Sequence, residues 1–557
     1  MKDNQQRVEA IIYPNQNQNF AEDKYFKDKS NTGICFSGGG SRAQVLAMGQ
    51  LRGLESLGLM ENIKYISSVS GGTWASVEYT YRKEDDTKKL IGEYIKPEDI
   101  TKDILSKNTP KMAQTSVKKK LLGISLGTIS PFTFNFILNL CKVTNKEIDT
   151  TRQWESVVAD TFLRPFKLAN DNHKGLFDLN EDSLNEFKKL NPSFKPRGGG
   201  IIHLLNKKSP YLIANGIITK PSSVDKLIKP SSSFIGVEFT PLYCEIPYRA
   251  NDGKTPKYHF STSFDPMYIG NGAVNSICFG STPIDKVQNN TISVIQQDDN
   301  FGLGAVSGIS SYFIGGIMSN TQLIKLLYTQ FKVLIEWYFS SDEKGKPVLQ
   351  DFPQDVFDIK DLILCLGNIR SRYAHLESKE ILKRLLEDAE ESISKLTTNP
   401  VLNCWSPLAT PDAIPRSEPF EFSDGGCMDN LGLVPLLRRK VEKVVVFINT
   451  EISLSTEVTH FDKVSSYDVD FWLTALFAST DIDNLKPHVA LGVDLSHNQV
   501  FNKDEFEIVY QALKSKKLKG QAVKTTTKHK VLKNDWWGID GDYEVEICWV
   551  YNEDAKN

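Results

Sequence analysis

The stretch that decides the fold is TGICFSGGGSRAQVLAMGQLRGLESLGL, residues 32–59. A short β-like run, Gly33–Ser37, is followed by three glycines and then by apolar residues close to a 3.6-residue period, which predicts a helix from Arg42 to about Leu57. The next run, Lys64–Val69, predicts a second strand. This strand–helix–strand order predicts two parallel strands joined by a right-handed crossover.

The glycines Gly38–Gly40 remove side chains from the turn between the first strand and the helix, so another group can come close to that backbone. With Ala43 they fit the dinucleotide pattern G-x-G-x-x-A, which makes a nucleotide-binding enzyme one alternative. That motif needs an acidic residue at the end of the second strand, and here the strand ends in serines. The G-K-[ST] of a Walker A loop is also missing.

The serines at the end of the second strand favour a different chemistry. In SVSGG, Ser70 has the small residue Ser68 two positions before it and Gly72 two positions after it, as the sharp turn of a nucleophile elbow requires. Attack of a serine on an ester creates an oxyanion, which preorganised N–H donors must stabilise. Since Gly38–Gly40 open a helix on the neighbouring parallel strand, their N–H groups suit that task, and the two motifs predict one site.

A serine nucleophile also needs a base, and no histidine of this chain stands in a recognisable motif. Asp424, in FSDGGCMDNLGL, follows a predicted strand and precedes two glycines. One interpretation is an ordinary Asp-Gly turn. The other is a Ser–Asp dyad in which the carboxylate takes the hydroxyl proton directly. Spacing alone leaves both open.

Composition limits the classes of partner and cofactor. The 557-residue chain has 40% hydrophobic and 24% charged residues and a formal net charge of −3, so no basic surplus indicates a nucleic-acid partner. Its eight cysteines form no C-x-x-C pair and share no metal-ligand spacing with the histidines, so we expect no metal and no cofactor. The N-terminus has no long apolar core, which excludes a secretory signal and predicts a cytoplasmic protein.

The motifs divide the chain unevenly. Residues 1–30 are expected to form a polar extension, and 31–557 one α/β domain whose sheet is built from both ends, with an insertion at roughly 85–400. Two long uncharged stretches, Leu121–Cys141 and Phe301–Ile324, are too diluted with polar residues for typical membrane spans and indicate buried segments. For Lys118–Cys141, which opens with three lysines, a surface that dips into a lipid interface is the alternative.

Three motifs together carry a resemblance. SGGGSRA at 37–43, SVSGGTW at 68–74 and SDGGCMDNLGL at 423–433 resemble the patatin-like and cytosolic phospholipase A2 lipid acyl hydrolases, and more closely the second branch. The resemblance implies an α/β sheet with helices on both faces and a large, mainly helical lid or cap insertion. Two details depart from that branch: Ser68 replaces the usual glycine, and the late motif is D-G-G, as in patatins.

The resemblance also implies roles for individual residues. Ser70 is the expected nucleophile, Asp424 its base, and Gly38, Gly39 and Gly40 the oxyanion hole. Arg42 is expected either to bind a lipid phosphate or to form a structural ion pair.

The function expected from these roles is calcium-independent, metal-free hydrolysis of fatty acyl esters of phospholipids or lysophospholipids through an acyl-enzyme. We expect peripheral membrane contact made by the catalytic unit itself, because the residues before the first motif leave no room for a C2 domain. A catalytically silent lipid-binding relative is the alternative.

Overall fold

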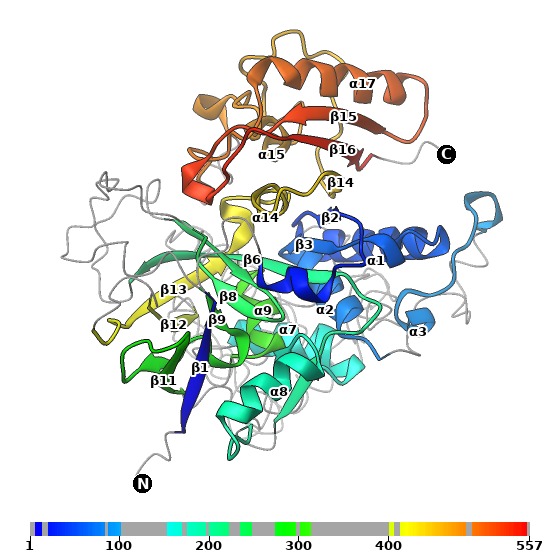
Figure 1. Cartoon of the computed structure of the whole chain (residues 1–557). Coiled ribbons are helices and arrows are strands. Elements are labelled where there is room, and N and C mark those ends of the chain that lie inside the picture. The colour runs from blue at the N-terminus through cyan, green and yellow to red at the C-terminus, as the bar shows by residue number, and fades with distance from the viewer. Residues whose placement is uncertain are drawn as a thin grey trace, which may run out of the picture.

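A computed structural model describes most of the chain on both sides of two long gaps. The described residues are 6–13, 20–83, 87–101, 153–169, 175–196, 200–221, 234–247, 273–296, 301–312, 400–405, 413–485 and 493–553. Within them the fold is mixed α/β, built on one large sheet of fourteen strands (Figure 1). A further two-stranded sheet pairs β4 (Gly175–Asp178) with β5 (Ile201–Leu204).

The centre of the large sheet is parallel, as the strand–helix–strand pattern predicts. Its strands, in sheet order, are β6 (Tyr211–Pro221), β3 (Tyr65–Val69), β2 (Thr32–Phe36), β14 (Lys443–Ile448) and β16 (Glu544–Tyr551). β3 is buried along its whole length, as expected for a strand covered on both faces. Because all five strands run the same way, their carboxyl ends meet at one edge of the sheet.

Antiparallel strands extend the sheet on both sides. β15 (Lys524–Lys530) is the strand next to β16. Beyond β6 the order is β7 (Ile235–Phe239), β8 (Tyr243–Glu245), β9 (Ala273–Asn275), β1 (Arg7–Tyr13), β11 (Thr291–Ile295) and β10 (Thr282–Pro283). A branch from β6 consists of β13 (Glu418–Asp424) and β12 (Val401–Cys404).

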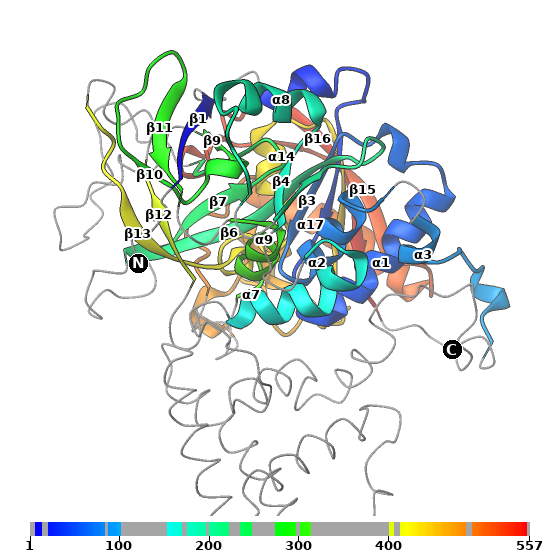
Figure 2. The same cartoon turned by 90° about the horizontal axis from the view of Figure 1, so that it is seen from below.

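Helices follow the parallel strands and cover the sheet. α1 (Gly40–Ser56) and α2 (Gly71–Thr80) pack against each other, and Figure 2 shows both together with α9 (Leu303–Ile309). α14 (Val434–Arg438) lies over β2, where a Cβ on Gly33 would stand 2.5 Å from Leu436. The other α-helices of the described residues are α3 (Thr87–Ile91), α7 (Gln153–Val158), α8 (Glu181–Leu190), α15 (Phe471–Ala475) and α17 (Phe506–Leu518).

The beginning of the chain differs from the expected polar extension. Residues Arg7–Tyr13 form β1, which pairs with β11 and β9 inside the large sheet. Glu22, in the 3-10 helix Ala21–Tyr25, is fully buried. The N-terminal segment is therefore part of the packed fold.

The middle of the chain is also less separate than the predicted insertion. Strands β6 to β11, between residues 211 and 295, belong to the same sheet as the strands that carry the three sequence motifs. The expected helical lid falls largely on 102–152 and 313–399, which lie outside the described residues, as does all of Lys118–Cys141. Of the stretch Phe301–Ile324, residues 301–312 are described and buried.

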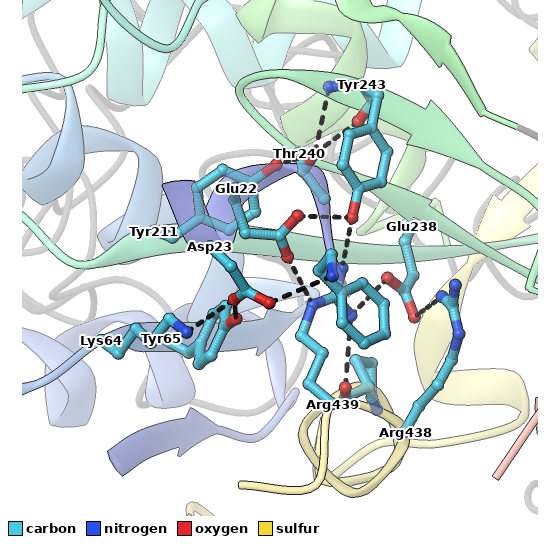
Figure 3. A network of polar contacts seen from close by, with 12 residues as sticks. Glu22, Asp23, Lys64, Tyr65, Tyr211, Glu238, Thr240, Tyr243, Arg438 and Arg439 are labelled. Atoms are coloured by element: carbon cyan, nitrogen blue, oxygen red, sulfur yellow. Dashed lines mark hydrogen bonds and ion pairs between the residues drawn. The ribbon is translucent and has the colours of Figure 1, made fainter. Parts of the chain in front are cut away.

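A buried network of charges ties the N-terminal segment to the sheet (Figure 3). The Glu22 carboxylate accepts a hydrogen bond from Arg439 Nε (2.9 Å) and one from the Tyr243 hydroxyl (2.8 Å). Arg439 also contacts Glu238, to which the neighbouring Arg438 binds as well. Burial opposes ionisation of Glu238, but the two guanidinium groups outweigh it and hold its pKa below the usual range.

In the described part of the chain, no helix is both long enough and apolar enough to cross a bilayer.

Candidate active site

Ser70 occupies the sharp turn between β3 and α2. It is the N-cap of α2, with φ 53° and ψ −126°, a conformation that costs energy for any residue with a side chain. Its backbone N–H donates to the carbonyl oxygen of Ser310 (2.9 Å), just after α9, and this bond helps to hold the turn. The side chain is 7% exposed. The serine therefore has the strained backbone that a nucleophile elbow predicts.

The two glycines after Ser70 let separate stretches of backbone touch. A Cβ on Gly71 would stand 1.7 Å from the carbonyl oxygen of Gly40, and one on Gly72 would stand 2.5 Å from that of Phe36. Neither clash can be relieved by moving a flexible side chain, because both partners are main-chain atoms. The group that comes close to the glycine turn after β2 is thus the turn after β3.

The first glycine motif forms the N-terminus of α1. Gly39 (φ 138°) and Gly40 (φ 59°) adopt conformations that favour glycine. As the N-cap and first residue of α1, they carry N–H groups that the helix itself cannot satisfy. The Gly38 N–H, in contrast, donates to the carbonyl oxygen of Asn430 (2.9 Å) and is already engaged. Of the predicted oxyanion donors, Gly39 and Gly40 are thus the better placed.

Asp424 is the last residue of β13 and lies beside Ser70. Its carboxylate accepts the backbone N–H of Gly426 (2.7 Å) and is 1% exposed. Burial raises the pKa of this carboxyl to about 7, although hydrogen bonds from the Gly426 N–H and the Ser70 side chain lower it. A carboxylate with such a pKa can take up and release a proton near neutral pH.

Strand β6 brings Ser70 and Asp424 together. In the register of the sheet, Val69, directly before Ser70, pairs with Asn215 on one side of β6. Asp424 pairs with the next residue, Gly216, on the same side of β6, because β7 pairs with both Asn215 and Gly216 on the opposite side. The two predicted residues, far apart in sequence, therefore end at the same point of the same sheet.

No protein-family model matches this chain, but short segments of it are similar to known proteins. Over 102 residues, 18% of its length, the chain is 36% identical to human cytosolic phospholipase A2 beta. Over a segment of the same length it is 32% identical to mouse cytosolic phospholipase A2 zeta. These matches span only 13% and 12% of the two relatives.

Over this segment the chain is similar to cytosolic phospholipases A2. Among solved structures, human GIVD cytosolic phospholipase A2 has a TM-score of 0.34 at 13% identity, over 80% of this chain and 49% of that one. The same protein in complex with methyl gamma-linolenyl fluorophosphonate inhibitor and terbium chloride has a TM-score of 0.26 at 16% identity, over 54% and 33% of the two chains.

Arg42 makes the contacts of a structural ion pair. Its Nε donates to the carbonyl oxygen of Asn449 (3.1 Å) and its Nη1 to the Glu451 carboxylate (3.1 Å). Both charged side chains remain partly exposed, at 38% and 62%. The guanidinium also lies close to Gly39, where a Cβ would stand 2.8 Å from Arg42 Nη2. Arg42 is therefore beside the proposed oxyanion donors, already bound to protein groups.

Three further residues contact the site and were not predicted from the sequence. Ser310 holds the backbone of the Ser70 turn. Asn215 donates to the Ser68 carbonyl oxygen (2.9 Å), and Asn430 places its Oδ1 where a Cβ on Gly38 would be only 2.1 Å away. Of these three residues, only Asn430 had a local signal in the sequence, because it follows Gly425 and Gly426 in the same motif. Ser310 and Asn215 reach the site through α9 and the sheet.

The described ranges contain no group of three or more His, Cys, Asp or Glu side chains that could hold a metal ion.

Proposed function

We propose that this protein is a serine acyl hydrolase that cleaves fatty acyl esters of phospholipids or lysophospholipids. The observation that carries the proposal is that Ser70, in its strained turn, and Asp424, a buried carboxyl with a pKa of about 7, end at adjacent positions along β6. The motif resemblance and the match to cytosolic phospholipases A2 support a lipid ester as the substrate.

The first half of the proposed reaction forms an acyl-enzyme. Ser70 Oγ attacks the ester carbonyl carbon while Asp424 takes the hydroxyl proton. The Gly39 and Gly40 N–H groups stabilise the oxyanion, a contribution of about 3 kcal/mol for a donor of this kind. Collapse of the intermediate breaks the ester bond, and the leaving alkoxide takes the proton back from Asp424.

The second half releases the fatty acid. Water gives a proton to Asp424 and attacks the acyl carbonyl, and the same N–H groups hold the second oxyanion. Breaking the acyl bond returns the proton to Ser70 Oγ. Each charge is handled by the protein's own groups, so we expect the reaction to proceed without calcium. Arg42 is proposed to orient the lipid phosphate if its bond to Glu451 opens.

The test is fatty-acid release from mixed phospholipid and lysophospholipid vesicles in the presence of a chelator. Ser70→Ala and Asp424→Asn are each expected to reduce release by at least about 10³-fold, because the nucleophile and its base act as a unit. Ser56→Ala and Asp483→Asn, both on the surface, are matched controls that should retain full activity. Release that survives Ser70→Ala would contradict the mechanism, and no release from the wild type would favour a silent lipid-binding relative.

A further inference from the structure

The stretch from Ile508 to Asn534, which covers most of α17 and all of β15, contains eight lysines and no acidic residue. The overall charge of the protein is −3, so this stretch is a local concentration of positive charge in a slightly acidic molecule. An acidic partner balances the charge of an exposed lysine, so the pairing of these eight lysines decides where positive charge remains.

Lysines near the end of β15 and beyond it are paired. Lys528 contacts Glu544 (3.3 Å), Lys530 contacts Asp542 (3.2 Å) and Lys533 contacts Asp535 (2.9 Å). The acidic partners come from the beginning of β16, from the turn before it and from the 3-10 helix Asp535–Trp537. At this end of the hairpin the positive charges are therefore balanced.

At the opposite end of the hairpin, lysines have no acidic partners in the part of the chain that the structure describes. Among the described residues, no ion pair involves Lys516, Lys519 or Lys524, and the Lys516 ammonium donates only to the Gln521 amide (3.3 Å). The residue opposite Lys524 on β16 is Val550. Leu518, between Lys516 and Lys519, is 66% exposed. We call Lys516, Leu518, Lys519 and Lys524 the basic corner.

Two neighbouring lysines are held differently. Lys517 donates to both oxygens of Glu553 (3.0 and 2.9 Å) and to the Leu454 carbonyl oxygen. It therefore connects α17 to the residues that follow β16. Lys514 lies over the Tyr510 ring, 5.7 Å from its centroid. Because Glu553 is engaged by Lys517, it does not neutralise the basic corner.

The basic corner lies at the same edge of the sheet as the candidate active site. β15 runs antiparallel to β16, and Lys524 at its start pairs with Val550 near the end of β16. β16, β14, β2 and β3 are parallel, so the carboxyl end of β16 and Ser70, directly after β3, share one edge. Four strand spacings separate β15 from β3, which is about 19 Å at roughly 4.8 Å each.

From this arrangement we infer that the basic corner is a docking surface for an anionic phospholipid bilayer. Its unpaired ammonium groups match negatively charged headgroups, and the exposed Leu518 can enter the interface between them. The inference rests on the proposed function in one respect: a lipid hydrolase must bring its site edge to the bilayer, and the basic corner lies on that edge.

The test separates binding from turnover by using the full chain with Ser70→Ala. Sedimentation with vesicles of phosphatidylcholine is compared with sedimentation with vesicles containing about one third phosphatidylserine, at an ionic strength of about 0.15 M. The variant Lys516→Gln/Lys519→Gln/Lys524→Gln removes the charges of the basic corner. The matched control Lys528→Gln/Lys530→Gln/Lys533→Gln removes the same number of charges from the paired end of the same stretch.

We expect binding to require phosphatidylserine and the basic-corner variant to bind on the order of 100-fold more weakly, at about 1 kcal/mol for each lysine, while the control changes much less. Equal loss in both variants, or equal binding to neutral vesicles, would overturn the inference. So would a basic-corner variant that keeps vesicle binding but loses affinity for heparin, because the partner would then be an acidic macromolecule. Vesicle binding without any hydrolysis by the Ser70 enzyme would contradict the proposed function and leave the docking surface intact.

Discussion

Asp424 is the residue whose chemistry depends most on its surroundings. An aspartate in water has a pKa near 3.9 and would be a poor base at neutral pH. Burial at the end of β13 raises the pKa of Asp424 to about 7, while the Gly426 N–H keeps the carboxylate oriented. The residue can then accept a proton from Ser70 and return it within one reaction cycle.

This pKa predicts the pH dependence of catalysis. Only the ionised form of Asp424 can act as the base, so kcat/KM should fall about tenfold per pH unit below pH 7 and level off above it. The measurement is hydrolysis of a water-soluble nitrophenyl ester between pH 5 and 9, which avoids any effect of pH on membrane binding. A profile that stays flat down to pH 5 would contradict the assigned base.

Gly71 gives a second prediction at the residue scale. Gly71→Ala would put a methyl group against the Gly40 carbonyl oxygen, so it should destabilise the fold by about 2 kcal/mol or more and abolish activity. Gly49→Ala is the matched control, because a Cβ at this position in α1 meets nothing within 4 Å and alanine favours a helix. Thermal unfolding of the two variants checks this, and equal melting temperatures would show that the two turns are not in close contact.

At the scale of elements, the short 3-10 helix Ala21–Tyr25 is held by charge rather than by a long apolar face. Its buried Glu22 fits between Arg439, at the end of α14, and Tyr243 of β8 (Figure 3). α14 begins a few residues after Asn430, in the segment that follows Asp424 at the end of β13. The network therefore connects the start of the chain to the element that follows the active-site loop.

Removing one partner from this network should be costly. Glu22→Ala leaves buried groups without their counter-charge, and we expect a loss of about 3–5 kcal/mol in the free energy of unfolding. Lys24→Ala, in the same element, removes an ion pair with Glu186 that is about half exposed (50% and 49%) and should cost less than about 1 kcal/mol. Denaturant unfolding of both variants makes the comparison, and similar losses would mean that Glu22 does not anchor the segment.

For the whole molecule, the sequence predicted best the features that depend on residues close together in the chain. The glycine turns, α1 and the parallel strands around them follow from short motifs and an apolar period, and the structure confirms them. β1 carried an alternating pattern, with Val8, Ala10 and Ile12 buried, but lay in a segment interpreted as polar. β1 pairs with β9 and β11, which lie far along the chain. Its place in the sheet therefore could not be recognised from the residues around it.

The candidate site was predictable in part for the same reason. Ser70 and Gly38–Gly40 belong to adjacent strand ends in one short unit, so their proximity follows from topology. The position of Asp424 depends on β6, which pairs along the same side first with β3 and then with β13. No local pattern indicates this register, and the contributions of Ser310 and Asn215 depend on the same long-range packing.

The most direct test of the central claim is the site and rate of reaction with a fluorophosphonate probe, which labels only an activated serine. Intact-protein and peptide mass spectrometry of the wild type should find one adduct, on Ser70, and Asp424→Asn should slow its formation by at least about 10³-fold. Asp483→Asn should label at the wild-type rate. An adduct on another serine, or labelling of Ser70 that is as fast without the Asp424 carboxylate as with it, would contradict a Ser70–Asp424 dyad.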